Sequence, residues 1–173
     1  AYAAVALENA DLYQQARNEI TERQKAEAAL RESEERYALA VRAANDGLWD
    51  WNLKKGQIYY SPRWKQMLGY AEEEISDNPN EWFNRVHPDD IAQLRTNISA
   101  HVKGLSAHFE CEYRIQHSSG AYRWMLSRGM AVIGSDKTAI RLAGSQTDIT
   151  LRKQAETKLL HDAFHDSLTE LPN

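Results

Sequence analysis

The feature that most constrains the fold of this chain is a strict alternation of apolar and polar side chains over residues 108–115. The apolar members are Phe109, Cys111, Tyr113 and Ile115, and the polar members are His108, Glu110, Glu112 and Arg114. Successive side chains of an extended strand point to opposite faces, so this alternation predicts a strand with one buried face and one exposed face. We expect the charged face to pair with neighbouring strands at the surface.

Four further strands are expected around this one. A turn at residues 117–120 (HSSG) leads into a return strand, on which Tyr122, Trp124 and Leu126 are expected to continue the apolar face. Residues 47–53 (GLWDWNL) alternate as well, and a turn at 54–56 joins them to the aromatic segment 57–60. Residues 139–149 (AIRLAGSQTDI) supply the last strand.

Helical segments lie between the two groups of strands. Short helices are expected over residues 62–69, 71–75 and 80–86, and a longer amphipathic helix over residues 88–102. The longer helix follows His87-Pro88-Asp89-Asp90, where proline at the first position and acidic residues in the first turn favour helix initiation. A histidine beside two carboxylates can also do acid–base chemistry, but neither a nucleophile nor a metal-ligand set accompanies it. The order of elements predicts an α+β fold, with a five-stranded antiparallel sheet and helices on one face.

Long helices are expected on both sides of this domain. Residues 1–44 contain no Pro or Gly and predict one long helix, which Asn45-Asp46-Gly47 would end. Its apolar stripe is formed by Ile20, Leu30, Tyr37 and Val41 and is interrupted by Arg23, Glu27 and Glu34. A homodimeric coiled coil is favoured over a solvated helix packed on its own domain. A second helix follows over residues 150–164, with Asp148 or Thr150 as its cap.

Composition excludes several classes of function. A net charge of -4 gives no overall attraction for nucleic acid or anionic lipid. The single cysteine, Cys111, cannot form an internal disulfide, which suits the reducing cytoplasm, and no Cys/His cluster has the spacing of a zinc site. No apolar run reaches the roughly 18 residues that span a bilayer, so no membrane contact is expected. We expect the chain to be a middle piece of a longer protein.

In combination, these motifs resemble the PAS family with its C-terminal PAC motif. The resemblance covers about residues 34–160 and rests on GLWDWNL…G.IYYS..W..MLGY, HPDD, FE.EYRI…G.YRW…RG and G…DIT.RK.AE.KL. It implies a sensory domain over residues 34–149 that passes a signal through its flanking helices. It also implies that Asp148, Ile149 and Thr150 form the junction that transmits this signal to the exit helix over 150–164.

The two flanks resemble other families. Residues 1–15 resemble the terminal helix of a GAF domain, so 1–33 are expected to be a signalling helix that ends such a domain and links it onward. Residues 165–173 (HDSLTELPN) resemble the start of a GGDEF diguanylate cyclase domain, truncated before its catalytic residues. This implies a receptor that makes cyclic di-GMP, of which the present chain is a non-enzymatic relay. The alternative is a dimerisation and spacer module without a ligand.

Aromatic residues are the candidates for lining a ligand pocket, although aromatic residues at such spacing more often form a core. They are Trp49, Trp51, Tyr60, Trp64, Phe83, Phe109, Tyr113 and Trp124. A light-sensing flavin needs a cysteine in the helical region, whereas Cys111 lies on a predicted strand. Haem needs an axial histidine near the long helix, for which His101 or His108 would be the candidates. We expect no cofactor, or an unidentified small molecule, and no metal.

Overall fold

The computed structural model describes residues 2–164, which belong to two compact units that divide between Ala44 and Asn45. The first unit is helix α1 (Tyr2–Ala44), continuous over 43 residues as predicted. Ion pairs one turn apart, such as Arg23–Glu27 at 2.9 Å, support the exposed helix. Asn45 adopts a left-handed φ of 56° and ends it. The family-implied boundary at residue 34 thus falls inside α1, and the predicted cyclase start at 165–173 lies outside the described residues.

The second unit is built on the predicted five-stranded sheet. Its strands are β1 (Gly47–Asn52), β2 (Gln57–Tyr60), β3 (Phe109–Gln116), β4 (Tyr122–Ile133) and β5 (Ala139–Asp148). They are ordered β2-β1-β5-β4-β3, and every neighbouring pair is antiparallel. This confirms the predicted fold class and places the last strand, β5, at the centre of the sheet.

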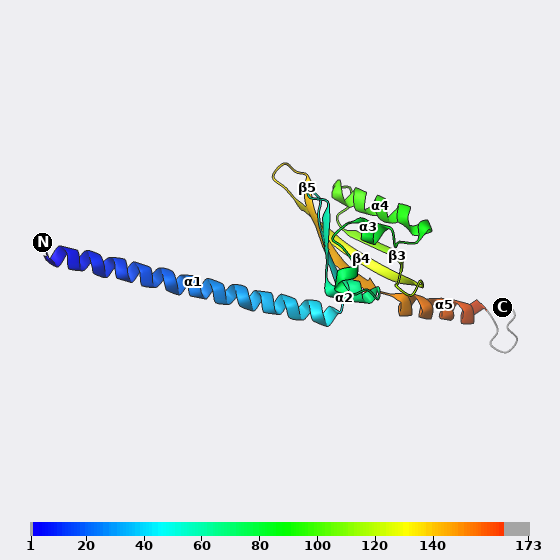
Figure 1. Ribbon diagram of the computed structural model, residues 1–173, viewed down its shortest axis with the longest axis horizontal. Helices are drawn as coiled ribbons and strands as arrows, with labels where there is room; N and C mark the ends of the chain where they lie inside the picture. Colours follow the sequence, from blue (N-terminus) through cyan, green and yellow to red (C-terminus); the bar gives the residue numbers. More distant parts are fainter. Residues whose placement is uncertain (1, 165–173) are drawn as a thin grey trace. The chain divides into compact units, whose positions relative to one another are not determined.

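Helices between β2 and β3 cover one face of the sheet (Figure 1). They are α2 (Pro62–Met67), the 3-10 turn η1 (Glu72–Glu74), α3 (Asn80–Phe83) and α4 (Pro88–Val102), and α5 (Thr150–Phe164) follows β5.

His87 caps α4, because its Nδ1 accepts the Asp89 N–H at 3.2 Å, and Pro88 takes the first helical position. The helix-initiation interpretation of this motif is therefore confirmed. Among residues 2–164, no helix has both the length and the apolarity needed to cross a membrane.

The register of β3 and β4 decides which side chains face the core. Tyr113 lies opposite Met125 and Ile115 lies opposite Arg123, so the inward positions of β4 are the odd-numbered ones. Trp124 therefore lies on the outer face, together with Tyr122 and Leu126. The prediction that these three residues continue the apolar face of β3 is wrong, because a shift of one residue in register exchanges the two faces of a strand.

The outer edge of β3 is closed by the segment that leads into α4. The His87 N–H donates to the Arg114 carbonyl at 2.8 Å, and the Gln116 N–H donates to the Arg85 carbonyl at 2.8 Å. The Arg114 N–H donates to the Asp90 carboxylate, also at 2.8 Å. Backbone groups of β3 that face away from β4 are thus paired within the chain over this stretch.

Candidate functional site

Seven of the eight aromatic candidates surround the interior between the sheet and the helices. Trp49, Tyr60, Trp64, Phe109 and Tyr113 are buried in one core cluster, and Trp51 and Phe83 pack against it partly buried. Trp124 lies on the outer face instead. The structure adds Trp82 of α3, which is fully buried and lies 5.0 Å from Trp49 between ring centroids. In the sequence Trp82 and Phe83 are adjacent, and only the helical phase of α3 decides which of them points inward.

Trp49 occupies a recess in the inner face of the sheet. Gly129 of β4 and Gly144 of β5 are direct cross-strand partners. A Cβ added at Gly144 would lie 2.6 Å from Cζ2 of Trp49, and one added at Gly129 would lie 2.7 Å from Cη2. The indole therefore rests on bare backbone, with Trp82 and, at 5.9 Å, the edge-on ring of Phe109 beside it. The two glycines shape a slot for a planar ring, and this chain fills the slot with its own side chain.

A polar group lies in the same interior. The Tyr113 hydroxyl donates to Oε1 of Gln146 at 2.5 Å and lies 3.0 Å from Oγ of Ser127, and all three residues are fully buried. Burial raises the pKa of Tyr113 far above its usual value, so the phenol remains a hydrogen-bond donor. Nε2 of Gln146 and Nε1 of Trp49 find no acceptor among the described residues. Because these two buried N–H groups have no acceptor, the interior favours a bound molecule that carries hydrogen-bond acceptors, such as water or a small carbonyl compound.

The histidines and the cysteine do not fit haem or a light-sensing flavin. Nε2 of His101 accepts the Ala131 N–H at 3.0 Å, and Nδ1 lies 2.9 Å from the Ser106 carbonyl, so both ring nitrogens are engaged. His108 is exposed next to β3. Cys111 lies on β3 rather than on a helix, and burial raises the pKa of its thiol. Within the described part of the chain, no three His, Cys, Asp or Glu side chains gather as a metal site.

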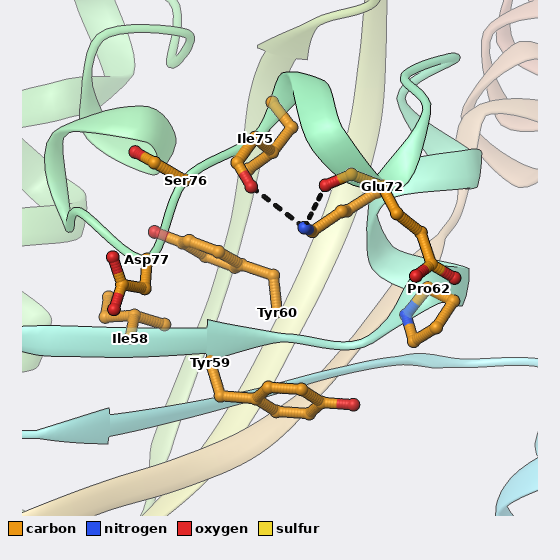
Figure 2. Close-up of a pocket in the computed structure, with 9 residues that line it drawn as sticks. Ile58, Tyr59, Tyr60, Pro62, Glu72, Ile75, Ser76 and Asp77 are labelled. Atoms are coloured by element: carbon orange, nitrogen blue, oxygen red, sulfur yellow. Dashed lines mark hydrogen bonds between the residues drawn. The ribbon is translucent and has the colours of Figure 1, made fainter.

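A small groove lies between β2 and the η1 segment (Figure 2). Its volume is about 180 Å³, and residues of both segments line it, including Tyr59, Ile75 and Asp77. The Lys65 ammonium donates to the Ile75 carbonyl at 2.8 Å and to the Glu72 carbonyl. This lysine therefore ties the loop to α2.

The predicted signal junction connects the end of β5 to the first turn of α5. Oδ1 of Asp148 accepts the Thr150 N–H at 2.9 Å, and Oδ2 pairs with Arg123 at 3.0 Å. The Trp124 N–H donates to Oγ1 of Thr150 at 3.0 Å, and the Ile149 N–H donates to the Trp124 carbonyl at 2.9 Å. Ile149 itself is buried. The cap of α5 is thus held by the neighbouring strand β4, so the direction of the helix depends on the sheet.

Comparison with known proteins places this architecture in a family. The family model described as PAS fold matches residues 57–146. A sensory box histidine kinase/response regulator from Burkholderia thailandensis E264 is 39% identical, with a TM-score of 0.64 over 72% of this chain and 92% of that chain. The uncharacterized protein y4lL of Sinorhizobium fredii is 31% identical over 90% of this chain and 19% of that protein. The probable diguanylate cyclase DgcE of Escherichia coli is 26% identical over 83% of this chain and 13% of that protein.

These matches agree with the sheet and the helices described above. The matched residues 57–146 run from β2 into β5 and include α2, α3 and α4. The chain spans only about a fifth or less of the length of y4lL and DgcE, so the activities of whole proteins do not transfer with the match. The agreement of the family model, the 39% identical structure and the fold shows that the chain belongs to the PAS family.

Proposed function

We propose that this chain is a sensory relay that couples a ligand or conformational input to a C-terminal diguanylate cyclase through its flanking helices. The observation that carries the proposal is the junction of Asp148 and Thr150, where the cap of α5 is built from β5 and β4 together. The cyclase output is supported by the resemblance of residues 165–173 to the start of a GGDEF domain and by the DgcE match. Cyclic di-GMP would then be the product of the linked domain.

The relay requires two conformations that an input distinguishes. An effector shifts an equilibrium only when it binds one conformation better than the other. Buried Ile149 anchors the chain between Asp148 and Thr150, so a shift of β5 against β4 would alter both hydrogen bonds of this junction at once, Thr150 N–H to Asp148 and Trp124 N–H to Thr150. The orientation of α5 would then report the state of the sheet to the domain that follows.

Alanine at either cap residue is expected to change the output of the full receptor. Asp148→Ala removes the acceptor of the Thr150 N–H together with the Arg123 pair, and Thr150→Ala removes the acceptor of the Trp124 N–H. A loss of about 1 kcal/mol shifts a two-state equilibrium about fivefold. Cyclase activity should therefore change severalfold in the basal or the stimulated state, measured as cyclic di-GMP formed from GTP.

Thr157→Ala serves as the matched control for these variants. It removes an exposed hydroxyl of α5 that donates to the Lys153 carbonyl of the same helix at 2.8 Å, and it should leave the output unchanged. Unchanged activity in both cap variants would instead support the second candidate function, a ligand-free dimerisation and spacer module. The occupation of the glycine recess by Trp49 favours that candidate, because the side chain already fills the space.

We also propose that a second copy of this chain covers the apolar stripe of α1. Of the predicted stripe, Ile20, Leu30 and Tyr37 are 57–65% exposed and Val41 is half-buried. Tyr13, one heptad before Ile20, is 71% exposed and extends the stripe. Sedimentation is expected to show a concentration-dependent dimer. Leu30→Glu should shift it toward monomer, whereas the off-stripe control Ala28→Glu should not. A wild-type monomer at high micromolar concentration would contradict the proposal. α5 is a further candidate contact, since Leu151 and Leu159 are exposed.

The domain is proposed to work in the cytoplasm, without haem, flavin or metal, between a preceding GAF domain and the following cyclase domain. Its lone cysteine, its acidic net charge of -4 and the engaged nitrogens of His101 support these assignments. No nucleic-acid or membrane partner is proposed. Catalysis is assigned to the linked domain rather than to this chain.

A further inference from the structure

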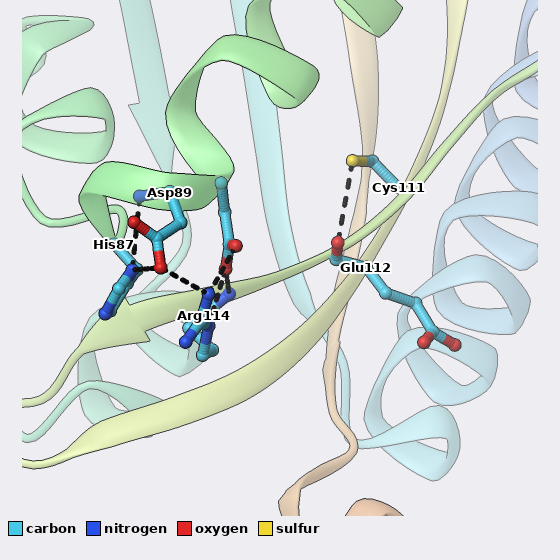
Figure 3. A network of polar contacts seen from close by, with 6 residues as sticks. His87, Asp89, Cys111, Glu112 and Arg114 are labelled. Atoms are coloured by element: carbon cyan, nitrogen blue, oxygen red, sulfur yellow. Dashed lines mark hydrogen bonds and ion pairs between the residues drawn. The ribbon is translucent and has the colours of Figure 1, made fainter.

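An arginine on the edge strand links the start of α4 to the outer face of the sheet. Nη2 of Arg114 donates to Oδ1 of Asp90 at 2.7 Å, and Nε donates to Oδ2 at 2.9 Å. Figure 3 shows Arg114 beside His87 and Asp89 at the beginning of the helix. This two-point contact fixes the guanidinium plane and lowers the pKa of Asp90, so the pair stays charged at neutral pH. The Arg114 side chain therefore moves together with the first turn of α4.

The guanidinium also lies over a tryptophan of the neighbouring strand. The central carbon of the Arg114 guanidinium is 5.5 Å from the ring centroid of Trp124, which is its direct cross-strand partner. Nζ of Lys153, in the first turns of α5, is 5.3 Å from the same ring. Both distances are within cation–π range, so one indole is in contact with a cation from β3 and a cation from α5. We call Arg114, Trp124 and Lys153 the edge stack.

A carboxylate on β3 holds the α5 end of the edge stack. Oε2 of Glu112 lies 2.7 Å from Nζ of Lys153, and the same carboxylate pairs with Arg152. The hydrogen bond from Lys153 lowers the pKa of Glu112, and the hydrogen bond to Glu112 raises the pKa of Lys153. Glu112 and Arg114 are two positions apart on one strand face. The first turns of α5 are therefore attached to β3 as well as to β4.

We infer that the edge stack is a second coupling route, which carries displacements of α4 around the edge of β3 to α5 through the side chains of Arg114, Trp124 and Lys153. It acts beside the backbone bonds that join Trp124 to Ile149 and Thr150. The inference rests on the proposed relay function, in which α5 carries the signal. Leu94 and Ile98 place α4 against the core, so a change in the contents of the interior displaces this helix. Asp90 and Arg114 then move the cation that contacts Trp124, and the ring passes the change to Lys153.

Hydrogen exchange in the chain 1–173 tests this route. Asp90→Asn keeps an acceptor for the Arg114 N–H but removes the charge that holds the guanidinium. It is expected to speed amide exchange over residues 153–157, the first hydrogen-bonded amides of α5, about three- to tenfold, although Asp90 lies on another helix. Trp124→Leu is expected to speed the same amides. In the Trp124→Leu background, Asp90→Asn should add nothing, because coupling within a network makes two substitutions non-additive.

Controls separate coupling from a general loss of stability. Glu110→Gln breaks the exposed Glu110–Arg128 pair on the same strand face and should leave α5 unchanged. Exchange of the β4 and β5 amides reports global stability in every variant. Coupling is reciprocal, so Lys153→Met should speed amide exchange at the start of α4 by a similar factor. If Asp90→Asn does not fold, the exchange measured in Lys153→Met tests the inference in its place.

Two outcomes would overturn the inference: wild-type exchange over residues 153–157 in Asp90→Asn, or simple addition of the Asp90→Asn and Trp124→Leu effects. Its failure is distinguishable from a failure of the relay function. If the amides are uncoupled while Thr150→Ala still changes cyclase output, the relay stands and the edge stack does not. If the amides are coupled but no variant changes the output, the edge stack stands and the relay fails.

Discussion

Replacing Trp49 with alanine is expected to lower the free energy of unfolding by about 3–5 kcal/mol, the range for removing a large buried aromatic ring. The recess beneath the ring cannot close easily, because Gly129 and Gly144 have no side chains to move into it and Trp82 is held by its own contacts. A planar cavity should remain. Free indole should then bind the variant and recover part of the lost stability, measured as an indole-dependent rise in the urea midpoint.

Trp51→Ala is the matched control for this experiment. Trp51 lies two residues further along β1, points to the same face and packs against Phe83 at 5.8 Å, but it is only partly buried. Its loss should reduce stability less, and indole should not restore it. Equal rescue of both variants, or no rescue of Trp49→Ala despite a large loss of stability, would show that no ring-shaped recess persists. Binding of indole to Trp49→Ala would show that the recess keeps the shape of a planar ring after the Trp49 side chain is removed.

Gly144→Ala is expected to lower the free energy of unfolding by about 3 kcal/mol or more, at the upper end of overpacking effects. Its Cβ would overlap the carbonyl oxygen of Arg128 and lie 2.6 Å from Cζ2 of Trp49 and 2.8 Å from the Cα of Gly129. Two of these neighbours are backbone atoms of the adjacent strand, which cannot rotate away. Urea unfolding followed by tryptophan fluorescence measures the change.

The same substitution at Gly56 gives the comparison. Gly56 has a φ of 66°, and an added Cβ would meet no atom within 4 Å, so Gly56→Ala costs only the left-handed strain of about 1–2 kcal/mol. The difference in unfolding free energy between Gly144→Ala and Gly56→Ala therefore measures the overlap of the added Cβ with β4 and with the Trp49 ring. If Gly144→Ala were as stable as Gly56→Ala, the close approach of Trp49 to bare backbone would be refuted.

Most of the sheet could be predicted because its strands carry local signals. Alternation marks residues 109–115, and turn residues at 54–56 delimit the hairpin, so β1, β2 and β3 lie within one residue of their predicted segments. β4 runs to Ile133, beyond the last residue named in its prediction, because its outer part has no strict alternation. The five-stranded antiparallel sheet with helices on one face followed from the order of elements, whereas the strand order β2-β1-β5-β4-β3 came only from the structure.

Contacts that depend on register or on distant partners could not be predicted in this way. The alternation of Tyr122, Trp124 and Leu126 predicts that Trp124 continues the apolar face, but the loop before β4 sets the parity of that strand. Cations cover the Trp124 ring on the outer face. Glu112 was expected to pair within the sheet, yet its partners come from α5. The glycine recess needs the pairing of Gly129 with Gly144, which no local pattern specifies.

The closed edge of β3 has a consequence for how copies of this protein can meet. An open edge strand invites a strand from another molecule, and continuous pairing of this kind leads to aggregation. Here the backbone groups of Arg114 and Gln116 are already hydrogen-bonded to Asp90, His87 and Arg85. Another chain cannot extend the sheet over these residues without first breaking those bonds. Self-association is thereby directed away from this part of the sheet edge and toward helical surfaces, where it can remain reversible.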